Sequence, residues 1–168
     1  MQKGDSFLFA TQLLERQLTG RSFAAFALVV NSAFAAEVYL KVLTIIERKL
    51  KPLKTHNLEH LFKDIGSYSQ KLIRETWDRD FLPDMQKDYS HIDLPKVFKH
   101  PQSFDDALRR SELAFVDFRY GGFSSEPRYY HMLALPVLLR NRIGEVRPEL
   151  IKAPKVTVYP ANPPPNRP

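Results

Sequence analysis

The sequence predicts an all-α protein, an antiparallel helical bundle of about five to six helices. Apolar residues recur at spacings of three and four along most of the chain, which is the period of a helix. The first 51 residues contain no proline, and the whole chain of 168 residues contains 6 glycines. Hydrophobic residues make up 43% of the composition, which is enough to bury the core of one domain of this length.

The first two helices are predicted from their apolar stripes and their punctuation. A helix over residues 5–18 ends near Gly20, which readily takes the left-handed conformation that follows a helix. A second, longer helix begins at Ser22 as its N-cap and is stopped by Pro52. Its apolar residues cover most of its circumference, which is typical of a helix in the middle of a bundle.

The amino-acid composition bears on where the protein is located and on the kind of partner that it binds. The apolar run over residues 23–30 is followed by Asn31 and Glu37, so we expect no membrane-spanning segment. The chain has no cysteine, which excludes disulfides and cysteine-ligated zinc and suits the cytoplasm. The net charge of +6 is compatible with an anionic partner such as RNA and equally with a solubility surface.

The middle of the chain is predicted to contain two more helices and a long connection. Thr55 is expected to cap a third helix that ends before Gly66, and a fourth continues to about Phe81. Residues 82–102 contain three prolines among polar residues, and we expect a long connection there.

Prolines dominate the last third of the chain. A fifth helix is expected over residues 103–120, with Ser103 as its cap, and a sixth could start at Ser125. Pro136 should kink or break the sixth helix, and a short strand over residues 132–139 is the alternative. Residues 1–150 are thus expected to form one helical domain, followed by an extended Pro-rich tail over 151–168.

Two charged residues of the long helix could serve a site. Glu37 and Lys41 lie four residues apart with the acid first, the favourable order for an ion pair on a helix. They lie at the edge of the apolar stripe. The pair is interpreted either as a structural ion pair at the rim of the core or as part of a charged groove between helices.

A short motif with two histidines raises zinc hydrolysis as a further alternative. His56 and His60 have the spacing of one helical turn, with Glu59 beside the second. Two such histidines can bind one zinc ion, and the glutamate can act as base on its bound water. A third ligand would have to come from Glu112 or Glu126.

Arg119 and Tyr120 end the predicted fifth helix. An arginine there can satisfy free carbonyl groups at the negative end of the helix. Alternatively, the two residues form a stacking and phosphate-binding pair, because guanidinium and phenol groups suit bases and anions.

Several segments together resemble the HEPN superfamily, small helical domains found with nucleotidyltransferases, toxins and antiphage systems. The similar segments occur in the expected order and cover about half of the chain. They are Ala36-Glu37-Val38-Tyr39-Leu40-Lys41, Thr55-His56-Asn57-Leu58, Leu61-Phe62 and Ala114-Phe115-Val116-Asp117-Phe118-Arg119-Tyr120.

The resemblance implies an antiparallel bundle, a homodimer and a role around RNA or nucleotides, sometimes with a partner protein. It carries a polar patch onto Glu37, Lys41, His56, Arg119 and Tyr120. Ribonuclease members use an arginine, four to six further residues and a histidine, and no histidine of this chain follows an arginine at that spacing.

The resulting expectation is a non-catalytic HEPN-like module of the cytoplasm, associated with a toxin–antitoxin or defence system. It dimerises and binds RNA, a nucleotide or a partner protein, without a cofactor, a metal or catalytic residues. The alternative is a metal-independent ribonuclease with a rearranged active site, in which His56 and Arg119 converge.

Overall fold

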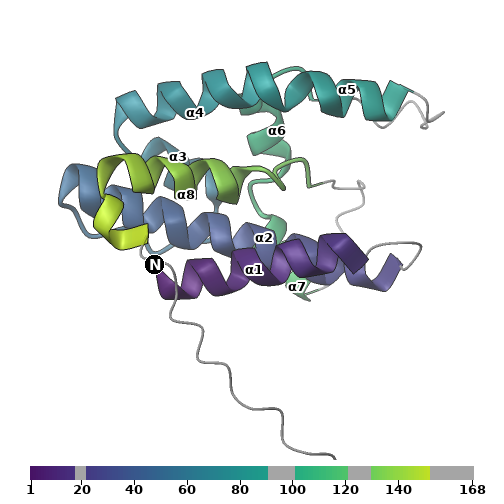
Figure 1. Cartoon of the computed structure of the whole chain (residues 1–168), viewed down its shortest axis with the longest axis horizontal. Coiled ribbons are helices and arrows are strands. Elements are labelled where there is room, and N and C mark those ends of the chain that lie inside the picture. The colour runs from purple at the N-terminus through teal and green to yellow at the C-terminus, as the bar shows by residue number, and fades with distance from the viewer. Residues whose placement is uncertain (18–21, 91–100, 121–129, 152–168) are drawn as a thin grey trace, which may run out of the picture.

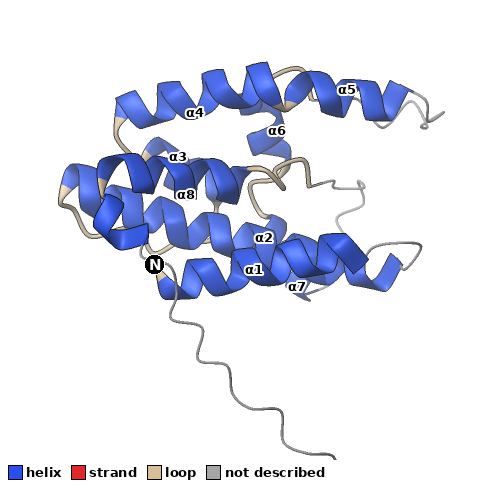
Figure 2. Ribbon diagram, viewed as in Figure 1, coloured by secondary structure: helices blue, strands red, loops and turns tan. Residues whose placement is uncertain are grey.

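The structure, a computed structural model, describes residues 1–17, 22–90, 101–120 and 130–151. Within these ranges the chain forms helices and turns and no strand, which confirms the all-α prediction (Figure 2). The helices are α1 Gln2–Gln17, α2 Ser22–Leu43, the π-helical turn η1 Thr44–Arg48, α3 Leu58–Lys63, α4 Ser67–Asp80, α5 Leu82–Ser90, α6 Phe104–Arg110, α7 Ala114–Tyr120, α8 Leu135–Val146 and the 3-10 turn η2 Pro148–Ile151.

Helix α2 is the centre of the fold, as its wide apolar surface predicted. It contacts α1, α3, α7 and α8, and Figure 1 shows α1, α2 and α8 side by side with their axes aligned. Helices α4 and α5 follow one another along the opposite edge of the molecule (Figure 1). Of the described helices, only the stretch Ala25–Arg48 is long and apolar enough to cross a membrane, and half of its apolar window is buried within the protein.

The long helix ends before Pro52 in an unusual way. Its last turn, η1, has π-helical hydrogen bonding, and Lys49 follows with φ 55°, in the left-handed region. The amide of Lys49 still donates to the carbonyl of Ile45, at 3.1 Å. Because a left-handed residue cannot continue a right-handed helix, the chain turns back at Lys49.

Two prolines expected to interrupt helices lie in first turns instead. Pro83 is the second residue of α5, and Pro136 is the second residue of α8. A first-turn amide has no acceptor within its helix, so a proline there costs nothing in hydrogen bonds. The expected connection over 82–102 is therefore wrong for residues 82–90, and both the kink at Pro136 and the strand over 132–139 are wrong.

The predicted fifth helix is divided in two. Its cap is confirmed, since Ser103 Oγ accepts the amide of Asp106 at 3.3 Å. Between α6 and α7, however, the carbonyl of Glu112 accepts the amide of Leu58 at 2.9 Å. Buried Ser111 Oγ accepts the amide of His131 at 3.1 Å. The carbonyl of Glu112 is thus bonded to a distant segment in place of an amide of its own helix, at the point where the helix is interrupted. The predicted start at Ser125 and the tail after Ile151 lie outside the described residues.

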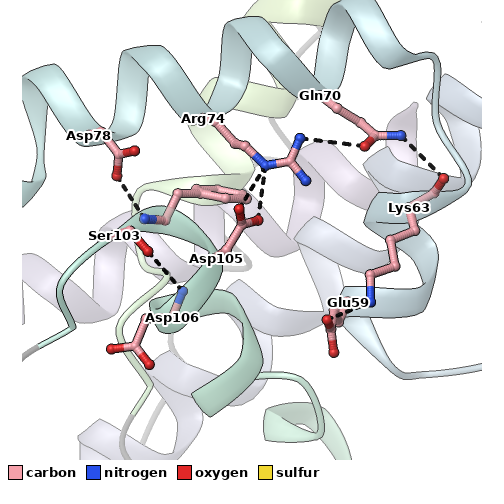
Figure 3. Close-up of polar contacts among 9 residues, drawn as sticks. Glu59, Lys63, Gln70, Arg74, Asp78, Ser103, Asp105 and Asp106 are labelled. Carbon is pink, nitrogen blue, oxygen red and sulfur yellow. Dashed lines mark hydrogen bonds and ion pairs between the residues drawn. The ribbon is translucent and has the colours of Figure 1, made fainter.

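The side of the core away from α1 is built from aromatic rings with polar contacts above them. Trp77 and Phe104 are fully buried and pack edge to face, 5.8 Å between ring centroids. Asp78 accepts the amide of Phe104 at 2.7 Å, and Arg74 binds Asp105 at 2.9 Å (Figure 3). These interactions hold α4 against α6.

The start of α1 is bound to both α2 and α8. Asp5 Oδ1 accepts the hydroxyl of buried Tyr39 at 2.9 Å and the Nε of Arg140 at 2.8 Å. Burial, and then the bond to the Asp5 carboxylate, raises the pKa of Tyr39 well above its ordinary value of 10.0, so the phenol remains a donor. Gly4 makes room for this ring, because a Cβ at residue 4 would lie 2.6 Å from Cε1 of Tyr39.

Candidate functional site

The candidate site is built around Glu37, in the second half of α2. Its side chain is 4% exposed, and both carboxylate oxygens have a basic partner. Oε1 accepts from Nζ of Lys41 at 2.7 Å, one helical turn further along. Oε2 lies 2.8 Å from Nδ1 of His56. The predicted ion pair with Lys41 is thus present, and His56 is a second partner of the same carboxylate.

His56 is held in place by the start of α3. The N-cap of this helix is Asn57, whose Oδ1 accepts the amide of His60 at 2.9 Å. Thr55, the expected cap, instead accepts the amide of Asn57 at 3.1 Å. Asn57 Nδ2 also donates to Oε2 of Glu112, at 3.1 Å. His56 directly precedes Asn57, so the two hydrogen bonds of the Asn57 side chain also fix the position of the His56 backbone.

The contact with Glu37 determines which nitrogen of His56 faces outward. An ionised carboxylate only accepts hydrogen bonds, so Nδ1 carries the proton in this contact. In the neutral ring, Nε2 then carries a lone pair. The side chain is 52% exposed, and within the described part of the chain Nε2 has no hydrogen-bond partner.

Phe115 of α7 connects His56 to Arg119. The rings of His56 and Phe115 lie 5.0 Å apart between centroids, and Phe34 of α2 stacks on Phe115 at 4.9 Å. Cζ of Arg119 lies 5.3 Å from the centroid of Phe115, in a cation–π contact. Residues 115 and 119 are one turn apart on α7, so both face the same side of that helix.

Four of the five predicted residues therefore belong to one continuous group of interacting side chains. We call it the Glu37 cluster, and it consists of Glu37, Lys41, His56, Phe115 and Arg119. The fifth predicted residue, Tyr120, ends α7, and its side chain is outside the described part of the structure. The cluster combines two basic side chains with one buried carboxylate, a half-exposed imidazole and an aromatic ring. Such a set can bind an anion that also carries a flat ring.

Phe115 is the member of the cluster that the sequence analysis did not select as a site residue. It is 4% exposed and so also belongs to the core. The available signal was its position four residues before Arg119, which places both side chains on one helical face.

The zinc alternative loses its geometric basis. His56 precedes the N-cap of α3 and His60 lies within the helix, so the two histidines are not one turn apart on a helix. Glu59 binds Lys63 at 2.6 Å, and this hydrogen bond lowers the pKa of its carboxyl group. Within the described ranges, no group of three or more histidine, aspartate and glutamate side chains could hold a metal ion.

Comparison of the chain with models of protein families, with curated proteins and with solved structures finds no match.

Proposed function

We propose that the chain is a non-catalytic, HEPN-like helical module of the cytoplasm that binds RNA or nucleotides through the Glu37 cluster. The observation that carries the proposal is a continuous set of contacts from three separate segments. Lys41 and His56 bind the same carboxylate, that of Glu37, and His56 and Arg119 contact the same ring, that of Phe115. The ordered resemblance of the same segments to HEPN domains supports it.

The chemistry of the cluster suits a phosphate beside a base. Lysine presents a compact charge with three donors, and arginine presents a planar fork that matches phosphate oxygens. The exposed imidazole of His56 offers a flat face and a second nitrogen. Because Glu37 holds Lys41 and His56 in place, less conformational entropy is lost when a ligand binds them.

Substitution of the two cations tests the proposal. Lys41→Gln and Arg119→Gln should each weaken binding of labelled single-stranded RNA and lower the slope of log affinity against log salt by about 0.7. Lys71→Gln is the control. Lys71 lies on α4, its side chain is 70% exposed, and its ion pair with Glu75 is long, at 3.8 Å. Binding that is equal in all three variants, with thermal unfolding unchanged, would remove the cluster as the ligand site.

Metal-independent RNA cleavage is the second candidate, and one observation favours it. His56 and Arg119 both contact the ring of Phe115, and the Glu37 carboxylate orients the imidazole. In that role, Nε2 of His56 accepts the proton of an RNA 2′-hydroxyl, whose oxygen attacks the adjacent phosphate to form a 2′,3′-cyclic phosphate. The bond from phosphorus to the 5′-oxygen breaks, the imidazolium returns the proton to this leaving oxygen, and Arg119 neutralises the charge on the phosphate.

Incubation of labelled RNA with an excess of chelator separates the two candidates. Cleavage that persists in chelator and disappears in His56→Ala would establish a nuclease. Intact RNA that is retained in a salt-sensitive manner would support the binding module.

Homodimerisation or association with a partner protein belongs to the same proposal. Phe9 and Leu13 are 62% and 46% exposed and lie one turn apart on α1, and Phe26 of α2 is 45% exposed. Large apolar side chains on one helical hairpin are typical of an interaction surface. Analytical ultracentrifugation should show a dimer that Phe9→Ser with Leu13→Ser converts to a monomer, and an unchanged sedimentation coefficient would count against this surface.

A further inference from the structure

A basic segment leads directly into the Glu37 cluster. Residues 49–56, which we call the basic loop, connect η1 to the N-cap of α3 and contain Lys49, Lys51 and Lys54. All three lysines are exposed. The loop ends at His56, whose ring belongs to the cluster.

The charges of these lysines are not neutralised by neighbouring acids. Their side chains form no ion pair or hydrogen bond with any residue in the described ranges, whereas Lys41, Lys63, Lys71 and Lys87 all have a partner. Of the other lysines in those ranges, only Lys3 resembles the three in this respect. Three of the four lysines without a partner in the described ranges therefore lie together in the basic loop.

The path of the loop aligns these charges with the cluster. The chain turns back at Lys49, where φ is 55°, and returns to the level of Glu37 at His56. Residues 37 and 48 are separated by roughly 16 Å along a helix axis, at about 1.5 Å per residue. The eight residues of the loop can span this distance, so its lysines are distributed between the end of η1 and the cluster.

We infer that the basic loop is a track for the sugar-phosphate backbone of single-stranded RNA, whose next nucleotide occupies the Glu37 cluster. The preferred ligand is then a polynucleotide and not a mononucleotide. This inference rests on the proposed function, because the cluster supplies the anchor from which the track extends.

The exposed leucines of the loop do not favour a membrane instead. Leu50 and Leu53 are 48% and 44% exposed and alternate with the lysines. Two half-exposed leucines offer little apolar area for insertion between lipids, whereas membrane-bound helices present a whole apolar face. Beside a nucleic acid, the same side chains can cover the faces of unstacked bases.

The test compares two oligouridylates, about 4 and about 16 nucleotides long, which bracket the common site sizes of single-strand binders. Wild type should bind the longer one more tightly and with a steeper salt dependence. The triple variant Lys49→Gln, Lys51→Gln, Lys54→Gln should lower the slope for the longer oligonucleotide by about 2, at about 0.7 for each phosphate that is no longer neutralised. Its binding of the shorter oligonucleotide should remain close to that of wild type.

The control is Lys63→Gln, Lys71→Gln, Lys87→Gln, which removes the same charge from lysines that have partners. If both triple variants weaken long-RNA binding equally, only net charge matters and the track is refuted. If Lys41→Gln abolishes binding of both oligonucleotides while the loop variant binds both like wild type, the Glu37 cluster is supported as the binding site and the track is refuted.

Two further outcomes overturn the inference in different ways. If wild type binds neither oligonucleotide, the proposed function fails together with the track. If it binds vesicles containing phosphatidylserine, and loses them on loop substitution without ever retaining RNA, the loop is a membrane-binding segment.

Discussion

Glu37 is the only charged residue that is buried within the described part of the chain. Taking a carboxylate out of water is costly unless its oxygens are paired, and here each oxygen has one basic partner. The partners Lys41 and His56 are therefore arranged around a group that depends on them.

Glu37→Gln should reveal this dependence. The substitution keeps the size of the side chain but removes its charge, and we expect a decrease of about 1–3 kcal/mol in the free energy of unfolding. Glu75→Gln, in an exposed pair at 3.8 Å, should change it by less than about 0.5 kcal/mol. Urea denaturation measures both, and equal decreases would contradict a specific role for the buried carboxylate.

The space beside Gly4 gives a second test at the level of one residue. A Cβ there would lie 2.6 Å from the buried ring of Tyr39, so Gly4→Ala should cost about 1–3 kcal/mol. At Gly144, within α8, the nearest atom is Cγ1 of Ile151 at 3.3 Å. There the gain in helix propensity, about 1 kcal/mol, should leave Gly144→Ala neutral or stabilising in a thermal melt. A neutral Gly4→Ala would mean that α1 does not pack closely on Tyr39.

At the scale of elements, the existence of helices was predictable and their ends were not. The boundaries at Ser103 and Gly66 follow from single residues with a clear preference, and they are correct. Thr55 and Asn57 are both good caps two residues apart, and Asn57 and the next residue, Leu58, make tertiary bonds to Glu112 that a local pattern cannot predict. Pro83 and Pro136 were misjudged because a proline breaks a helix in its interior but not in its first turn.

Removal of the true cap of α3 should matter more than removal of the expected one. Asn57→Ala removes both the bond to the amide of His60 and the bond to Glu112, so we expect a cost of about 1–2 kcal/mol. Thr55→Ala removes one bond to the amide of Asn57 and should cost about 0.5 kcal/mol. Chemical denaturation of the two variants measures the difference, and the reverse order would place the cap at Thr55.

Asp106 of α6 should make the stability of the fold depend on pH. Burial alone would raise the pKa of Asp106, but hydrogen bonds from Arg110, Arg109 and the amide of Gln102 outweigh it and lower the pKa below 3.8. A carboxyl group with a lower pKa in the folded state stabilises the fold above about pH 4, and this contribution is lost as the pH falls through the folded-state value.

Asp106→Asn should therefore be less stable than wild type at neutral pH. The difference in melting temperature should shrink as the pH is lowered from about 7 to about 2, because the wild-type carboxylate becomes protonated. A constant difference over this range would show that the ionised form of Asp106 does not contribute.

At the scale of the molecule, the candidate site was predictable only where it is local. Lys41 follows Glu37 by one turn, so the helix itself brings them together. The contact between Glu37 and His56 depends on the return of the chain after Lys49, and that between His56 and Phe115 on the packing of α7. The spacing of apolar residues along the chain does not predict these two contacts, because they depend on how the whole core packs.

The bonds of Asp5 have a consequence for motion. A first helix is normally the place where a chain frays. Here Asp5 is bound to Arg140, 135 residues later, and to Tyr39 in the central helix. Helix α1 therefore cannot detach without breaking these two hydrogen bonds to the rest of the fold. Its amide protons should exchange with solvent as slowly as those of α2 and α8, through opening of the whole fold. Helix α5, which packs on α4, should exchange earlier, and hydrogen exchange followed by mass spectrometry would show whether the molecule opens from its middle before its beginning.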